Sequence, residues 1–291
     1  YLKNGKINST YEKNHIYANL SSNFSFLDKK DLKNNYKNNI LELTLKKQNN
    51  ENIKIQGNIS NDKTLINPKV FLNLLKLDPN FVTDDKINLQ TDNKFQFDID
   101  ENNQLKNYLI NSNIKLDKLI TNKNLQNLLY FKNINTDLTL KDGSFKVDLK
   151  SNYSFLNDKY NNTDDNNKIN LKLNKIKDIS SVEIFLNTKD NKINIKEFKN
   201  IFNLQTNILD DQIVNLDSDS LIKFTVNKTY KINNLSLKSD LALDTLRIKY
   251  KSNIIKKYIP TYKNKLTLKK PKIIISYSNG MLDFQLDGKY T

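Results

Sequence analysis

The sequence predicts an all-β protein, with an elongated, twisted antiparallel sheet curled into an open groove and a few short amphipathic helices. Three observations lead to this fold class. Apolar and polar residues alternate over long stretches, which places the apolar ones on one face of each strand. Two dipeptides typical of tight hairpin turns separate such stretches. Hydrophobic residues make up only 37% of the chain, which suits strands that each bury a single face.

The clearest element is a hairpin around Asn279-Gly280. Both central positions of a type I′ turn need φ > 0, and Asn-Gly suits them well. Counting outward from this turn brings every apolar residue of one strand opposite an apolar residue of the other. A one-residue slip would move one set to the other face, so the register is well specified. The predicted pairs are Ile273 with Leu286, Ile275 with Phe284, and Tyr277 with Leu282.

A second hairpin is expected around Asp142-Gly143, because the same count again pairs apolar residues only. Leu140 is predicted to face Phe145, and Leu138 to face Val147. Two independent hairpins with matching register are harder to obtain by chance than either one alone.

Alternation predicts further strands along the chain, at residues 16–26, 41–45, 53–59, 110–116, 169–173 and 222–226. Two polar stretches are interpreted as turns. Residues 87–89 are expected to pair with 95–99 across Thr91-Asp92-Asn93, and Leu186 is expected to face Ile193 across the residues between them. The apolar residues occupy odd-numbered positions before Asp244-Thr245 and even-numbered positions after it, which predicts a bulge or a tight turn at these two residues.

Helical spacing of apolar residues predicts four short helices between groups of strands. The first has Asn67 as N-cap and Pro68 at the first helical position. The expected helices span residues 68–77, 125–131, 197–204 and 254–258. Such helices, together with the small number of glycines, argue against a transmembrane barrel, whose wall consists of strands alone.

The organisation expected from length and composition is a single elongated segment over residues 1–291, with the polar loop near 157–168 as the one candidate sub-boundary. Because the chain begins at Tyr1, it is expected to be a piece of a longer protein. The chain has no cysteine, which excludes a disulfide scaffold and a thiolate metal site. No apolar run approaches the roughly 20 residues of a membrane-spanning helix.

The net charge is +15, from 47 Lys and Arg against 32 Asp and Glu. One interpretation is binding to polyanions or anionic lipid head groups. The alternative is nucleotide bias, since Asn, Lys and Ile are all read from AT-rich codons. A nucleic-acid-binding function would depend on the charge alone, because no recognition motif accompanies it. The prediction is therefore no nucleic-acid partner.

No pattern of residues indicates catalysis or metal binding. His15 is the only histidine, and the paired acids Asp164-Asp165 and Asp210-Asp211 lie in expected loops. There is neither a glycine-rich phosphate loop nor a nucleophile elbow. The chain is predicted not to be an enzyme and to need neither a metal nor another cofactor.

The remaining feature is the one-sided apolar stripe, for which two interpretations stay open. The stripe is either the core of a ligand-free β-sandwich, as in an adhesin-like surface or structural protein, or the floor of an open groove that lipid covers. On the second interpretation the lining residues are Leu138, Leu140, Phe145, Val147, Ile169, Leu171, Leu173, Val182, Ile184, Leu186, Ile193, Ile195, Phe224, Val226, Leu235, Leu237, Leu241, Leu243, Ile273, Ile275, Tyr277, Leu282, Phe284 and Leu286.

The residues from Tyr258-Ile259-Pro260 through the final hairpin to Gly288-Lys289, and the alternation of hairpins with short helices, resemble the AsmA-like superfamily. The likeness is to the repeats of its large YhdP- and TamB-type members. It implies a segment of a periplasmic β-groove, held at the inner membrane of a Gram-negative, AT-rich bacterium by an N-terminal anchor outside these residues. It further implies phospholipid acyl chains as the partner and transport toward the outer membrane as the function.

Overall fold

The computed structural model describes residues 2–13, 15–24, 39–48, 51–69, 72, 82, 86–120, 129–155, 167–196, 199, 209–210, 212–249, 253–258, 260, 263 and 265–290. The chain forms two compact units. Unit 1 comprises residues 1–120, 131–151 and 171–180, and unit 2 comprises 121–130, 152–170 and 181–291. The expectation of a single segment stays a prediction, and most of its candidate boundary near 157–168 lies outside the described residues.

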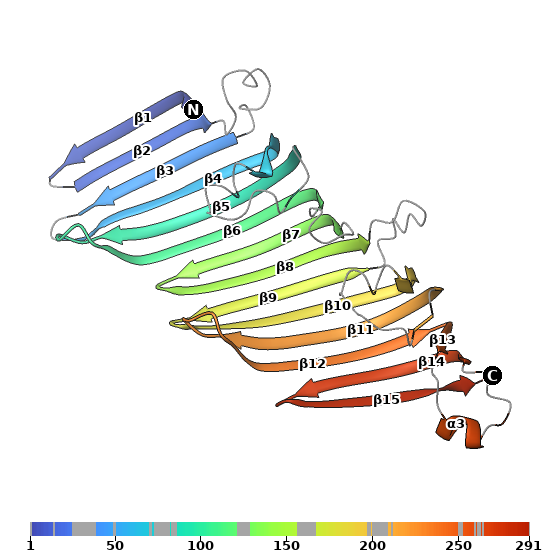
Figure 1. Ribbon diagram of the computed structural model, residues 1–291. Coiled ribbons are helices and arrows are strands. Elements are labelled where there is room, and N and C mark those ends of the chain that lie inside the picture. The colour runs from blue at the N-terminus through green and yellow to red at the C-terminus, as the bar shows by residue number, and fades with distance from the viewer. Residues whose placement is uncertain are drawn as a thin grey trace. The chain divides into compact units, whose positions relative to one another are not determined.

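The predicted fold class is confirmed: the described residues form one open antiparallel sheet with very few helices. Strands follow one another in chain order through the sheet, except that β13 and β15 both pair with β14. In unit 1 the first six strands are β1 (Leu2–Glu12), β2 (His15–Phe24), β3 (Asn39–Lys47), β4 (Ile53–Ile66), β5 (Ile87–Ile99) and β6 (Leu105–Ile120). They lie side by side in Figure 1.

Four strands have residues in both units: β7 (Leu129–Lys141), β8 (Ser144–Phe155), β9 (Lys168–Ile176) and β10 (Ile179–Asn194). Unit 2 continues with β11 (Ile213–Val226), β12 (Ile232–Leu243), β13 (Thr245–Lys249), the helix α3 (Asn253–Tyr258), β14 (Lys265–Ser278) and β15 (Met281–Tyr290). Within it, β13 pairs with β14 beyond the end of β12, so β12 and β13 share one long partner strand.

Both predicted two-residue turns are present. Asn279 and Gly280 have φ of 51° and 79°, and Asp142 and Gly143 have 44° and 81°, as a type I′ turn requires. In the last hairpin Ile273 lies opposite Leu286, Ile275 opposite Phe284 and Tyr277 opposite Leu282, all as predicted. The predicted irregularity at Asp244-Thr245 is also confirmed, since β12 ends at Leu243 and β13 begins at Thr245.

The other two predicted turns are wrong, because the chain continues straight through them. Thr91 to Asn93 lie inside β5, and the residues between Leu186 and Ile193 lie inside β10. Asp190 has φ of 49°, and this left-handed residue is an irregularity within β10 rather than a reversal of the chain. A bulge changes the parity of the side chains and kinks the strand without ending it.

The predicted helices fall largely outside the described residues. A helix does begin at Pro68, and the Asn67 side chain accepts a hydrogen bond of 3.0 Å from Lys69 N. An equivalent helical turn follows Asn194, whose side chain accepts a hydrogen bond of 3.0 Å from Lys196 N. The helix expected near 254–258 is α3. The one expected near 125–131 is wrong at its end, because β7 already includes residues 129–131.

The two units repeat the same local structure at a separation of 127 positions. In unit 1, Asn88 N donates to the Asp117 side chain at 3.1 Å. In unit 2, Asn215 N donates to the Asp244 side chain at 3.0 Å. Other features recur at the same separation, namely the left-handed residues Lys63 and Asp190, Asn103 and Tyr230, and Asn107 and Asn234. Each unit therefore contains the same local features at equivalent positions, with the same residue type at some of them, such as Asp117 and Asp244, and different types at others, such as Lys63 and Asp190.

The most buried side chains gather at one end of the strands in each unit. In unit 1, Ile66, Ile87 and Leu89 pack together, with Ile114, Leu116 and Leu119 against them. In unit 2, Leu246, Leu268 and Ile273 pack together, with partly buried neighbours that include Leu241, Leu243 and Ile275. Leu119 and Leu246 are again 127 positions apart.

Candidate functional site

The apolar face of unit 2 consists of rows of side chains that cross four strands. One row contains Ile222, Leu237, Tyr277 and Leu282, and the next contains Ser220, Ser239, Ile275 and Phe284. A third contains Ser218, Leu241, Ile273 and Leu286. Directly opposed residues lie on the same face of a sheet. The strand registers therefore bring the predicted lining residues of β12, β14 and β15 together.

Polar contacts of β10 indicate that its predicted lining residues Val182, Ile184 and Leu186 lie on this same face. Glu183 pairs with Lys223 of β11 at 3.0 Å, and the Asn187 side chain donates to Asp219. Both β11 partners alternate with Ile222, so they lie on the opposite, polar face. Val182, Ile184 and Leu186 alternate with Glu183 and Asn187, and they consequently point to the apolar face.

The predicted lining residues differ widely in exposure. Three are buried, namely Val182, Ile195 and Ile273, and seventeen are half-buried. Four are exposed, namely Leu235 at 40%, Leu286 at 43%, Phe284 at 60% and Leu282 at 67%. Leu235 lies beside the left-handed residue Asn234, where the register of β11 and β12 shifts. The other three lie on β15, the last strand of the sheet.

The described strands of unit 2 follow one another edge to edge, and none forms a second layer over the apolar face. The face has a closed end and an open end. Ile273, at the closed end, packs against Leu246 and Leu268. Toward the Asn279-Gly280 turn, Phe284 and Leu282 are mostly exposed. The exposure of the predicted lining residues therefore rises from Ile273 toward the Asn279-Gly280 turn.

In unit 1 the same face carries larger side chains above a glycine. Gly57 lies between Leu43 and Phe95 in the sheet. A Cβ atom on Gly57 would lie 2.5 Å from Cζ of Phe95 and 2.6 Å from the Glu42 carbonyl oxygen. The Phe95 ring thus occupies the space above Gly57, and it stacks at 6.2 Å from the Phe97 ring. Glycine is needed here because the ring approaches the backbone.

A band of buried polar side chains crosses the apolar face of unit 1, which the sequence analysis did not predict. Thr64 donates to Asn39 at 2.6 Å, and the Asn39 amide donates to Phe24 O at 3.0 Å. Asn61 donates to Leu89 O at 2.6 Å and accepts from Thr91. The sequence does contain an indication of this band, namely polar residues at positions where the alternation places apolar ones. Ser22, between Leu20 and Phe24 on the same face of the strand, is an example.

Unit 2 has a similar band. Tyr153 and Thr188 share a hydrogen bond of 2.6 Å, and so do Ser220 and Ser239. Burial raises the pKa of the Tyr153 phenol, and the hydrogen bond to Thr188 partly opposes this shift. These hydrogen bonds link β8 with β10 and β11 with β12 across the apolar face.

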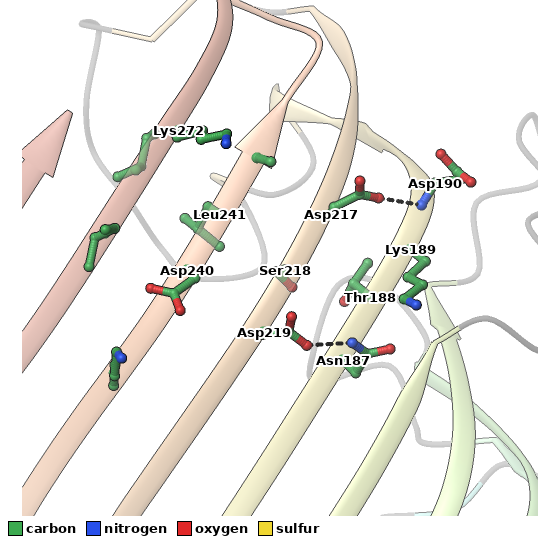
Figure 2. A pocket seen from close by; sticks show the side chains of 14 residues that line it. Asn187, Thr188, Lys189, Asp190, Asp217, Ser218, Asp219, Asp240, Leu241 and Lys272 are labelled. Carbon is green, nitrogen blue, oxygen red and sulfur yellow. Dashed lines mark hydrogen bonds between the residues drawn. The ribbon is translucent and has the colours of Figure 1, made fainter. Parts of the chain in front are cut away.

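A hollow in unit 2 lies on the polar face, away from the predicted site. It measures about 640 Å³, and Figure 2 shows the side chains around it. Asp190 N donates to Asp217 at 2.7 Å, and the Asn187 side chain donates to Asp219. A smaller hollow of about 460 Å³ in unit 1 is lined by Lys63, Gln90 and Lys115, among others.

The charges around the unit 2 hollow nearly balance. Its charged lining residues are Lys189, Asp190, Asp217, Asp219, Lys238, Asp240 and Lys272. Two of the carboxylates already accept hydrogen bonds from β10. Within the described ranges no three acidic or histidine side chains come together in an arrangement that would hold a metal ion. The hollow lies beside the left-handed residue Asp190 and is accounted for by the kink in the strand.

Comparisons with protein-family models, with curated proteins and with solved structures find no match to this chain. The resemblance to the AsmA-like superfamily therefore stays a prediction. No helix among the described residues is both long enough and apolar enough to span a bilayer.

Proposed function

We propose that this protein binds the acyl chains of phospholipid along the apolar face of its sheet and carries them between membranes. The observation that supports this is the open end of the unit 2 face. There, Ile222, Leu237 and Tyr277 form a row that ends in Leu282, which is 67% exposed. The other three side chains of the row are half-buried, and an apolar row that continues into an exposed surface is typical of surfaces that bind an apolar partner.

The energetics suit a carrier with low selectivity. Each buried CH₂ group contributes about 0.8 kcal/mol, so a long acyl chain gains on the order of 10 kcal/mol without any specific polar contact. In the polar band of unit 2, Ser220 and Ser239 bond each other, which already uses one of their two donors. Head groups would remain in water beyond the strand edges. Transport between an inner and an outer membrane is the finer proposal, and it depends on the resemblance to the AsmA-like superfamily.

Adjacent residues on β11 provide a matched pair of variants. Ile222 faces Leu237 on the apolar face, and Leu221 faces Lys238 on the polar face, while both are half-buried. Ile222→Asp places a carboxylate in the path of the acyl chain, and Leu221→Asp places the same group beside a lysine. We expect Ile222→Asp to lose most of the phospholipid that co-purifies with the parent chain and Leu221→Asp to retain it. Mass spectrometry of extracted lipid measures both.

Transfer is tested separately, by following a fluorescent phospholipid from donor to acceptor vesicles. The parent chain and Leu221→Asp are expected to accelerate transfer, and Ile222→Asp to fail. Equal lipid content in the two variants would refute binding at this face. A parent chain that carries no phospholipid and takes none from vesicles would favour the alternative, a ligand-free surface or structural protein.

A further inference from the structure

The stretch from Thr245 to Leu282 is the longest in the chain without an acidic residue, and it is strongly basic. It contains ten lysine and arginine residues. The whole chain has 32 acidic residues in 291, which would place about four in a stretch of this length. A bias toward AT-rich codons favours lysine, but acidic residues are frequent in the rest of the same chain. Codon bias alone therefore does not account for this stretch.

Many of these charges gather where β13 pairs with β14, at one end of the strands of unit 2. Leu246 lies opposite Leu268 there, and both belong to the buried cluster. Residues that alternate with these two leucines lie on the opposite, polar face of the sheet. Four of them are exposed basic side chains, namely Arg247, Lys249, Lys265 and Lys269.

Two pairs of lysines lie directly opposite each other on this face. Lys249 faces Lys265 across β13 and β14, and Lys269 faces Lys289 across β14 and β15. Like charges in directly opposed positions destabilise a sheet. Local features that oppose stability are expected at functional sites. The repulsion favours an anionic partner, which would relieve it.

The carboxylates near this face balance only part of its charge. Asp210 pairs with Lys249 at 2.5 Å, and Asp287 lies opposite Lys272. Asp244 accepts hydrogen bonds of 3.0 and 2.7 Å from two backbone N–H groups. The remaining acids of the polar face nearby surround the hollow of Figure 2 together with Lys189, Lys238 and Lys272, and they are Asp190, Asp217, Asp219 and Asp240. A clear excess of positive charge remains where β13 and β14 pair.

The connection from β13 to β14 leaves the sheet and returns to it at this same end, and it adds further positive charge. It contains α3, which has no acidic residue in its first turn and has Lys256 and Lys257 in its last. Both lysines are exposed, as are Lys263 and Tyr258, the latter at 76%. The Lys257 ammonium group lies 6.0 Å from the centre of the Tyr258 ring. Lysine and tyrosine each combine an apolar body with a polar tip, which suits both to the boundary between membrane and water.

We propose that this basic end of unit 2, defined as residues 247–269 together with Lys289, binds the head groups of anionic phospholipids at a membrane surface. Clusters of four to eight lysine or arginine residues are attracted to anionic leaflets, and each such residue strengthens binding about fivefold. Lysine is a point charge on a flexible stem, whereas arginine suits bidentate recognition of a fixed phosphate. Arg247 is the only arginine in the stretch, which favours a fluid surface of head groups over a nucleic acid. This attachment goes beyond the binding of acyl chains at the apolar face and does not depend on it.

Co-sedimentation with vesicles tests the proposal on the 291-residue chain. The chain is expected to bind vesicles of phosphatidylcholine mixed with phosphatidylglycerol and not vesicles of phosphatidylcholine alone. Binding should weaken as salt is added, because salt screens exposed charges. The double variant Lys256→Gln with Lys257→Gln removes two charges, and we expect roughly tenfold weaker binding or more. The matched control is Lys228→Gln with Lys231→Gln, which removes two exposed lysines at the opposite end of the strands and should bind as the parent does.

Fluorescence locates the contact on the chain. The sequence has no tryptophan, so Tyr258→Trp introduces a single indole at the basic end. Tyr230→Trp introduces a single indole at the opposite end of the strands, where Tyr230 is 89% exposed. With phosphatidylglycerol vesicles, we expect the emission of Tyr258→Trp to shift to shorter wavelength, because the indole leaves water. The emission of Tyr230→Trp should stay unchanged.

The variant Ile222→Asp separates the basic end from the proposed lipid face. It is expected to bind the anionic vesicles as the parent chain does, even where it loses co-purifying phospholipid. The Lys256→Gln, Lys257→Gln variant is expected to keep that phospholipid. Failure of one proposal is thereby distinguishable from failure of the other.

Three results would overturn the proposal. The first is equal binding of the parent chain to vesicles with and without phosphatidylglycerol, or no binding to either. The second is an equal loss of binding in the two double lysine variants, or a spectral shift in Tyr230→Trp with none in Tyr258→Trp. The third is binding of a duplex oligonucleotide at salt concentrations that release the vesicles, with loss of that binding in the Lys256→Gln, Lys257→Gln variant, which would make a nucleic acid the partner.

Discussion

The loop after β5 in unit 1 and the loop after β11 in unit 2 have the same backbone hydrogen bonds and different chemistry. In unit 1, Asp100 opens the loop, and its side chain accepts from Asn102 N at 2.9 Å and from Gln104 N at 2.8 Å. Lys106 adds an ion pair of 2.7 Å to the same carboxylate. Asn103 is the left-handed residue, with φ of 58°.

In unit 2 the first residue is Asn227. Its side chain accepts from Thr229 N and from Lys231 N, both at 3.0 Å, and from the Thr229 hydroxyl at 2.8 Å. Tyr230 is the left-handed residue, also with φ of 58°. The comparison shows that this turn needs one acceptor oxygen at its first position and one left-handed residue at its fourth. The charge of the acceptor and the identity of the left-handed residue are free to vary.

The largest predicted difference between the units is at Gly57 and its counterpart Ile184, which lie 127 positions apart. Gly57→Ala forces a Cβ atom against Phe95 and the Glu42 carbonyl oxygen. We expect a loss of about 3 kcal/mol in the free energy of unfolding, in the range for overpacked sites. Ile184→Ala removes atoms from a half-buried site, and we expect a smaller loss. Chemical denaturation, with hydrogen exchange to identify the unit affected, measures both changes.

A double variant sharpens this result. The change Phe95→Ile introduces the residue type that unit 2 has at the equivalent position, Ile222. It removes the ring that lies over Gly57. The pair Gly57→Ala with Phe95→Ile should therefore cost less than the sum of the two single changes. Additive costs would show that the ring is not what requires glycine at this position.

The contrast between the units also explains how much was predictable from sequence. The turns at Asn279-Gly280 and Asp142-Gly143 were predictable, because φ > 0 at two successive positions demands particular residues. The run Thr91 to Asn93 was misinterpreted as a turn, although Thr91 hydrogen-bonds to Asn61 within the polar band. In a chain so rich in Asn and Lys, a polar run does not distinguish a turn from a strand.

The repeat between the units is visible in the sequence at some equivalent positions, such as Asn88 with Asn215 and Asp117 with Asp244, whereas others share a role without sharing a residue type. Lys63 and Asp190 are both left-handed, yet neither is a residue type that favours this conformation as strongly as glycine does. Of the candidate site, alternation predicted which residues share a face. It did not predict that Ile273 is buried while Phe284 is exposed, since exposure depends on neighbouring strands.

A smaller effect is expected where the loops differ in their left-handed residue. Tyr230 is 89% exposed, so its ring gains little from packing, and asparagine tolerates φ > 0 better than an aromatic residue does. Tyr230→Asn should stabilise the β11–β12 hairpin by about 1 kcal/mol. Asn103→Tyr, the reverse change in unit 1, should destabilise the β5–β6 hairpin by a similar amount. Hydrogen exchange of each hairpin is the measurement, and changes of the same sign in both would contradict the equivalence of the loops.

The smallest predicted effect is a difference in pH dependence between the two loops. The hydrogen bond from Lys106, followed by that from Gln104 N, lowers the pKa of Asp100 below its ordinary 3.8. A carboxylate with a lower pKa in the folded chain stabilises the fold above the unfolded value, and this contribution is lost as pH falls through the folded value. Below pH 3.8 the β5–β6 hairpin should therefore weaken progressively. The loop at Asn227 has no titrating group at the same position.

Exchange of one residue type tests this directly. Asp100→Asn gives unit 1 the acceptor that unit 2 already uses, and it keeps the side-chain oxygen that the turn needs. We expect the variant to form the loop at neutral pH but to lose the acid-dependent part of the β5–β6 protection, measured by hydrogen exchange between pH 5 and pH 2.5. Because other carboxylates titrate over the same range, the difference between parent and variant is the informative quantity. An unchanged acid response in Asp100→Asn would show that the ion pair with Lys106 does not contribute to stability, as is common for ion pairs whose lysine is exposed to solvent.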